Sequence, residues 1–190
     1  MPDPMPFGSL WIPVVVSTVV VFLLSSIIHM ALKYHQADYK ALPNEEAVRE
    51  ALGKGSLPPG LYMLPHCGSM KAMEEPANKA KFEKGPVGNI AIIPNGPPAM
   101  GKYLGQWFAY CFLMSFVCGY IARHTLQPGA AGLLVMQITG TVAFVGYGFT
   151  NIIDSIWKGQ PWANTGRSLL DGLIYSVGTG ATFWLLFPKG

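Results

Sequence analysis

The sequence has 190 residues, of which 51% are hydrophobic and only 12% are charged, whereas an ordinary soluble domain is roughly 25% charged. Its net charge is only +3 and it has no long basic run, so nothing indicates a nucleic-acid partner. Three cysteines are too few for a disulfide scaffold. This composition predicts an integral membrane protein.

Four stretches are long and apolar enough to cross a membrane, because a hydrocarbon core of about 30 Å requires about 20 residues. They are residues 10–32, 103–122, 130–153 and 169–187. Asp171 is the single charged residue inside them. Since lipid offers no partner to free backbone groups, these spans must be helical. The expected fold class is an all-α integral membrane protein with four transmembrane helices and a folded α+β loop between helices 1 and 2.

This pattern divides the chain into three parts. Residues 1–32 are the N-terminal tail and first helix, 33–102 the extramembrane loop, and 103–190 helices 2 to 4. The first span is expected to be retained, because Met1-Pro2-Asp3-Pro4 lacks the positive charge of a signal peptide and the apolar run is longer than usual.

The distribution of basic residues predicts the orientation. Nine Lys and Arg lie in residues 33–102 and two more, Lys158 and Arg167, between spans three and four, which makes 11 against two on the opposite side. The positive-inside rule then places the loop in the cytoplasm and both termini outside. We expect a multi-pass protein of a bacterial inner membrane.

The long loop is expected to fold, since seven basic and seven acidic residues balance between Tyr34 and Gly101 and apolar residues recur throughout. Asn44 precedes an acidic first turn and an amphipathic segment that stops at Gly53, which is typical of a short surface helix. Residues 76–84 favour a second helix. Residues 61–64 and 89–93 are expected to be short strands.

Small residues predict how the spans pack, because in lipid they let helix backbones approach each other. In two spans, small residues recur at every fourth position and so form a ridge along one face of the helix. We expect these two faces to contact each other. They are Cys111, Ser115 and Gly119 in span two and Gly172, Ser176 and Gly180 in span four. Gly140, Gly146 and Gly148 in span three are less regular and are expected to permit a kink or to accommodate an aromatic ring.

Several short motifs carry a family resemblance. They are the Gly159-Gln160-Pro161-Trp162 turn, the preceding Ile156-Trp157, and the span-two segments Phe112-Leu113-Met114-Ser115-Phe116 and Ala122-Arg123-His124. From Tyr103 onwards the chain resembles a bacterial family of small four-helix integral membrane proteins of unknown function. That family has a much shorter first loop. The resemblance implies the fold and supplies no activity.

The densest group of metal-binding side chains lies in the loop. It comprises Met63, His66, Cys67, Met70 and Met73. Thioether, thiolate and imidazole together suit Cu(I). The spacing matches no established motif, and methionines in an apolar-rich loop more often fill irregular gaps or lie on the membrane surface. We therefore favour one of these roles and keep copper binding as the alternative.

Two ionisable residues lie inside the predicted spans, where such groups are functional candidates. His29 is expected to hydrogen-bond a neighbouring helix or the loop. Asp171 could belong to a proton or cation path with Arg167 or Asn151. Because Ser168 and Asp171 have capping-box spacing, we favour a helix cap.

No Ser/His/Asp arrangement, phosphate loop or metalloprotease motif is present, so an enzyme is unsupported. The sequence favours a non-catalytic accessory or assembly subunit that binds lipid and other membrane subunits, or a homo-oligomer, with no cofactor. A copper-handling protein is the first alternative. A small proton-coupled transporter centred on His29 and Asp171 is the second.

Overall fold

A computed structural model describes residues 5–189. The expectation about Met1-Pro2-Asp3-Pro4 lies outside the described residues. The chain separates into two compact units. We call residues 5–38, 99–155 and 160–189 the helical unit, and residues 39–98 with 156–159 the loop unit.

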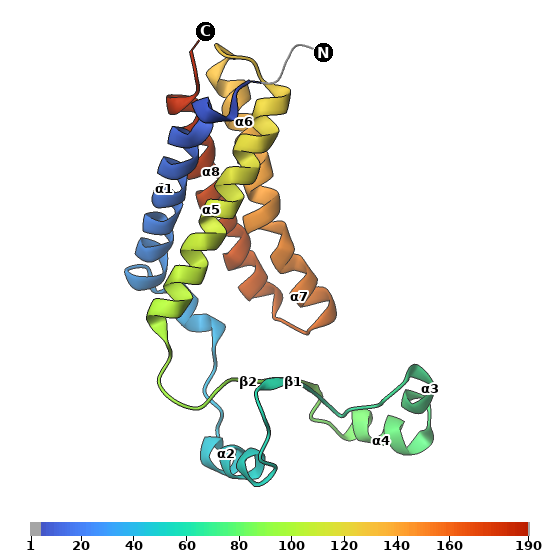
Figure 1. Ribbon diagram of the computed structural model, residues 1–190. Helices are drawn as coiled ribbons and strands as arrows, with labels where there is room; N and C mark the ends of the chain where they lie inside the picture. Colours follow the sequence, from blue (N-terminus) through green and yellow to red (C-terminus); the bar gives the residue numbers. More distant parts are fainter. Residues whose placement is uncertain (1–4, 190) are drawn as a thin grey trace. The chain divides into compact units, whose positions relative to one another are not determined.

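The helical unit contains four helices that are long and apolar enough to span a membrane, which confirms the four predicted spans. They run side by side in Figure 1. The first is α1 (Trp11–Met30), preceded by the 3-10 helix η1 (Phe7–Leu10). The others are α5 (Met100–Thr125), the interrupted third span, and α8 (Trp162–Leu186). The chain is therefore a multi-pass membrane protein.

The third span is interrupted, as its irregular glycines predicted. Helix α6 (Gly132–Tyr147) ends at Gly148, and the 3-10 helix η3 (Phe149–Asn151) leads into α7 (Ile152–Trp157). The Asn151 side-chain amide donates to the backbone carbonyls of Tyr147 and Gly148, at 2.9 and 3.0 Å. At the break, backbone carbonyls lose the hydrogen bonds that a continuous helix would give them, and the Asn151 side chain replaces part of this loss.

Helix α8 begins seven residues before the predicted start at residue 169. Pro161 precedes it in an extended conformation, and the helix then includes the polar residues Asn164 and Arg167. A prediction from hydropathy starts the span after such polar residues. The helix can nevertheless begin earlier, because the part of it that lies outside the hydrocarbon tolerates them. Asp171 consequently lies well after the first turn of α8, not at its start.

The two ridges of small residues do not meet, so that prediction is wrong. A Cβ on Gly180 would lie 2.9 Å from the Met136 carbonyl oxygen of α6. A Cβ on Gly119 of α5 would instead lie 2.9 Å from the Val14 side chain of α1. The most extensive helix pair is α6 with α8, and α5 packs mainly on α1 and α6. The remaining ridge residues, Cys111, Ser115, Gly172 and Ser176, are buried.

Two hydrogen bonds join chain segments at the end of the helical unit where α5 finishes. Arg123 Nε donates to the Met5 carbonyl at 2.7 Å, and the Gly129 amide donates to the Pro188 carbonyl at 2.9 Å. The starts of η1 and α6 and the end of α8 therefore lie at one end of this unit (Figure 1).

The loop unit is a set of short elements. They are α2 (Glu45–Lys54), β1 (Gly60–Leu64), α3 (Met70–Met73), α4 (Pro76–Lys84) and β2 (Gly88–Ile92). The strands pair antiparallel, with Tyr62 opposite Ile90. Both predicted helices and both predicted strands are confirmed, while α3, which the Ser69 hydroxyl caps, was not predicted. No described side chain of this unit is buried.

Candidate functional site

A group of ionisable side chains gathers where α1 ends. Directly after this helix, the 3-10 helix η2 (Lys33–Asp38) carries Tyr34, His35 and Asp38. These residues contact Arg167 and Asp171, which lie four residues apart on α8 and therefore share a face. We call these five residues together with His29 the histidine–aspartate cluster.

His35 lies at the centre of the cluster and bridges two carboxylates. Its Nδ1 lies 2.6 Å from Asp38 Oδ2, and its Nε2 lies 2.8 Å from Asp171 Oδ2. Each ring nitrogen can donate a hydrogen bond when it carries a hydrogen, or use its lone pair when it does not. The His35 side chain is 17% exposed and that of Asp171 is 8% exposed, so both are largely removed from solvent.

Arg167 fixes the carboxylate of Asp38. Its Nε donates to Asp38 Oδ1 at 2.5 Å, and Asn164 donates to the Asp38 backbone carbonyl at 3.1 Å. Burial alone would raise the pKa of the Asp38 carboxyl. The hydrogen bonds from His35 and Arg167 and their positive charge outweigh burial and lower this pKa below its ordinary value.

Tyr34 and His29 complete the cluster around Asp171. The Tyr34 hydroxyl donates to Asp171 Oδ1. Burial, and then this hydrogen bond and the charge of the carboxylate, raise the pKa of Tyr34 well above its ordinary value. His29 Nε2 lies 3.8 Å from Asp171 Oδ2 and 3.4 Å from the Tyr175 hydroxyl of α8. The latter contact is of the kind expected for His29, with a neighbouring helix.

The predicted role of Asp171 as a helix cap is wrong. Because α8 starts at Trp162, neither Ser168 nor Asp171 lies in its first turn, and Asp171 instead accepts hydrogen bonds from η2. The suggested partners of Asp171 also differ from the structure, since Arg167 pairs with Asp38 and Asn151 caps α6.

The sequence did not predict the contacts of Tyr34, His35 and Asp38, and it suggested Arg167 as a partner of Asp171 rather than of Asp38. A signal was present, because His35 and Asp38 have the i,i+3 spacing of one helical turn and Arg167 and Asp171 the i,i+4 spacing of one helix face. The two pairs are more than 120 residues apart in the chain, so no local pattern joins them.

The loop candidates for copper binding lie in the loop unit. Met63 is on β1, His66 and Cys67 follow it, and Met70 and Met73 belong to α3. Met70 and Met73 border a surface hollow of about 500 Å³ that Glu74 and Glu83 also line. Cys67 is a free thiol. Soft-metal binding by these residues stays a prediction.

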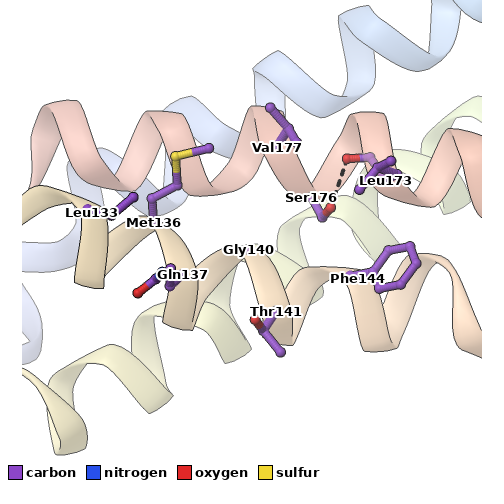
Figure 2. Close-up of a pocket in the computed structure, with 9 residues that line it drawn as sticks. All are labelled: Leu133, Met136, Gln137, Gly140, Thr141, Phe144, Leu173, Ser176 and Val177. Carbon is purple, nitrogen blue, oxygen red and sulfur yellow. Dashed lines mark hydrogen bonds between the residues drawn. The ribbon is translucent and has the colours of Figure 1, made fainter.

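A second candidate site is an open groove between α6 and α8 (Figure 2), with a volume of about 300 Å³. Gly140 of α6 and the ridge residue Ser176 of α8 line it, and a Cβ on Gly140 would approach the Ser176 carbonyl oxygen to 3.3 Å. Gln137 and Thr141, one turn apart on α6, are exposed along the same groove. Among residues 5–189, no hydrogen bond is found for the Gln137 side-chain amide. It is therefore available to a neighbouring molecule.

Comparison with known proteins gives no relative. No protein-family profile matches the sequence, and neither the curated proteins nor the solved structures yield a match. The resemblance from Tyr103 onwards stays a prediction.

Proposed function

We propose that this protein is a non-catalytic accessory or assembly subunit of a membrane complex, a four-helix bundle that binds a membrane-spanning helix of a partner subunit in the α6–α8 groove. The proposal places it in a bacterial inner membrane, with the loop unit in the cytoplasm. The observation that carries it is the exposed Gln137 amide inside an apolar span.

An unpaired amide is costly on a surface that faces hydrocarbon. Gln137 lies five residues after the start of α6, which is about 8 Å along the helix axis. Its side chain offers two donors and an acceptor, and amide side chains in membrane helices commonly bond across to another helix. A partner helix in the groove would supply that bond.

The floor of the groove suits close approach of a second helix. Gly140 has no side chain and the Ser176 hydroxyl bonds back to the Leu173 carbonyl at 2.8 Å (Figure 2), so neither projects far. Small residues at such positions let helix backbones approach and pack by van der Waals contact. The groove therefore combines a polar contact with the space for a helix.

The loop unit supports the same proposal independently. It contains apolar side chains such as Leu61, Met70 and Ile93, which are 67%, 76% and 64% exposed. A two-stranded hairpin is marginally stable when it buries little. A cytoplasmic part of the partner subunit would cover these side chains and provide the burial that this unit lacks.

The test is purification from the native membrane in gentle detergent, followed by native mass spectrometry. The wild-type chain is expected at fixed stoichiometry with a partner. Gln137→Leu removes the amide and is expected to weaken the complex roughly three- to twentyfold, the equivalent of one intramembrane hydrogen bond. Thr141→Trp is expected to block the groove more strongly, because the new side chain occupies the space of the partner helix.

Gln106→Leu is the matched control, since Gln106 is an exposed amide of α5 outside the groove. It should leave the complex intact. A wild-type chain that is monomeric in the native membrane would contradict the proposal. If the complex is a dimer of this chain that Thr141→Trp dissociates, the second copy replaces the partner subunit as the occupant of the groove.

A further inference from the structure

Three side chains of the histidine–aspartate cluster bring metal-ligand atoms together. One ligand atom each from His29, His35 and Asp171 lies within 4.8 Å of the others. Asp171 Oδ2 is 2.8 Å from His35 Nε2 and 3.8 Å from His29 Nε2. Ligands held 2.0 to 2.2 Å from a tetrahedral ion are about 3.3 to 3.6 Å apart. Small side-chain rotations would therefore turn this group into a coordination sphere.

We propose that His29, His35 and Asp171 bind one divalent first-row transition-metal ion of the Zn²⁺ or Fe²⁺ type. Two imidazoles and one carboxylate form a borderline nitrogen and oxygen donor set, which such ions prefer. The set contains no sulfur, which separates it from the alternative Cu(I) site in the loop. It contains two imidazole nitrogens, which distinguishes it from the all-oxygen sites of Mg²⁺ and Ca²⁺.

The residues behind these ligands match the outer shell of a metal site. A metal-binding histidine almost always donates its other ring N–H to a carboxylate, a carbonyl or water, which fixes the ring. His35 Nδ1 faces Asp38 Oδ2 at 2.6 Å, and Arg167 in turn holds Asp38. The second oxygen of Asp171 accepts a hydrogen bond from Tyr34. These contacts hold the His35 ring and the Asp171 carboxylate in place, with Nε2 and Oδ2 only 2.8 Å apart.

The charges of the cluster favour a cation beside Asp171. Arg167 balances Asp38, whereas the nearest groups to Asp171 are two imidazoles and a tyrosine hydroxyl. A carboxylate in a membrane-spanning helix is costly unless it is paired, and a dication pairs it directly. The His29 side chain is 52% exposed, so the rest of the described chain does not enclose this side of the cluster.

The experiment uses the full chain in detergent, stripped of metal with a chelator. Co²⁺ is titrated while its visible absorption bands are recorded, and Zn²⁺ is then added as a competitor. We expect one Co²⁺ per chain and full displacement by Zn²⁺. The control is His124→Ala, which should bind Co²⁺ like the wild type. His124 lies at the C-terminal end of α5 and is not part of the cluster.

His29→Ala is the most informative variant, because His29 is half exposed and its nearest hydrogen-bond contact is 3.4 Å long, so its removal leaves the fold intact. It should weaken Co²⁺ binding by more than about 100-fold, beyond the range typical of outer-shell changes. Asp38→Asn tests the positioning of His35 and should weaken binding about 10- to 100-fold while the absorption bands of the saturated protein persist.

Three results would overturn the proposal. One is a wild-type chain that binds no Co²⁺ or Zn²⁺, which would leave the cluster as a set of hydrogen bonds between η2 and α8. Another is binding that His29→Ala and His35→Ala both leave unchanged. The third is binding that is lost when His66 and Cys67 are replaced by alanine, which would place the metal in the loop unit. None of these outcomes depends on the presence of a partner subunit.

Discussion

The helical unit and the loop unit differ in what holds them together. In the helical unit a continuous core joins all four spans, with Val14, Cys118 and Phe183 fully buried. In the loop unit the elements are as regular, yet no described side chain is buried. Local sequence signals therefore suffice to form secondary structure in both units, but only the helical unit has tertiary packing of its own.

The ion pairs of the two units show the same difference. The Arg167–Asp38 pair of the helical unit is 23% and 16% exposed, and it shares its carboxylate with His35. The Lys54–Glu50 pair of the loop unit is 74% and 67% exposed. Water screens the exposed pair, whereas breaking the shielded one leaves charged groups without partners.

The largest effect is expected from Gly172→Ala. Its new Cβ would lie 2.6 Å from the Gly148 Cα, so backbone rather than a flexible side chain must move. We expect a loss of about 1 to 3 kcal/mol in the free energy of unfolding, as for other overpacked cores. The measurement is unfolding by a denaturing detergent in mixed micelles, followed by tryptophan fluorescence.

Gly166→Ala is the control for this substitution, because a Cβ there meets nothing within 4 Å on the same helix. It should be neutral or stabilising by up to about 1 kcal/mol, since alanine favours helix more than glycine does. Equal effects of the two substitutions would show that the contact between α8 and Gly148 is not tight in the membrane.

An intermediate effect is expected from Asp38→Ala. Arg167 and His35 both lose a charged hydrogen-bond partner. Because both side chains are partly exposed and water replaces part of each bond, the combined loss stays within the roughly 1.5 to 3 kcal/mol of one such bond. The expected loss in unfolding free energy is about 2 kcal/mol. Glu50→Ala, which removes the exposed pair with Lys54, should change it by less than about 0.5 kcal/mol. A comparable loss from both variants would contradict the difference between the units.

The smallest effect on the helical unit is expected from Leu61→Ser. Leu61 lies on β1 and is 67% exposed, so the substitution removes no buried contact. The unfolding free energy of the four helices should stay within about 0.5 kcal/mol of wild type, while the amount of co-purified partner subunit falls. A clear loss of helix stability would mean that the loop unit contributes to the core after all.

The sequence predicted the four spans and the elements of the loop well, because hydropathy, caps and turn residues are local signals. It failed where the outcome depended on residues far apart. Gly172 and Gly119 were placed correctly on helix faces, but which neighbour each face contacts depends on the packing of all four helices. The start of α8 was misplaced because Arg167 interrupts the apolar pattern. With the start placed at residue 169, Arg167 fell outside the helix, so it was not expected to share a helix face with Asp171. The same error led to the wrong prediction that Asp171 caps the helix.

The contact between η2 and α8 has a consequence for biosynthesis. Tyr34 and Asp171 are 137 residues apart in the chain, so the ribosome completes the first partner long before the second. At roughly 5 to 20 residues per second, the interval is on the order of ten seconds. During this time His35 and Asp38 stand at the end of an inserted first helix without the residues of α8. A nascent chain arrested before residue 162 should therefore expose η2 to proteases, and release of the last helix should protect it.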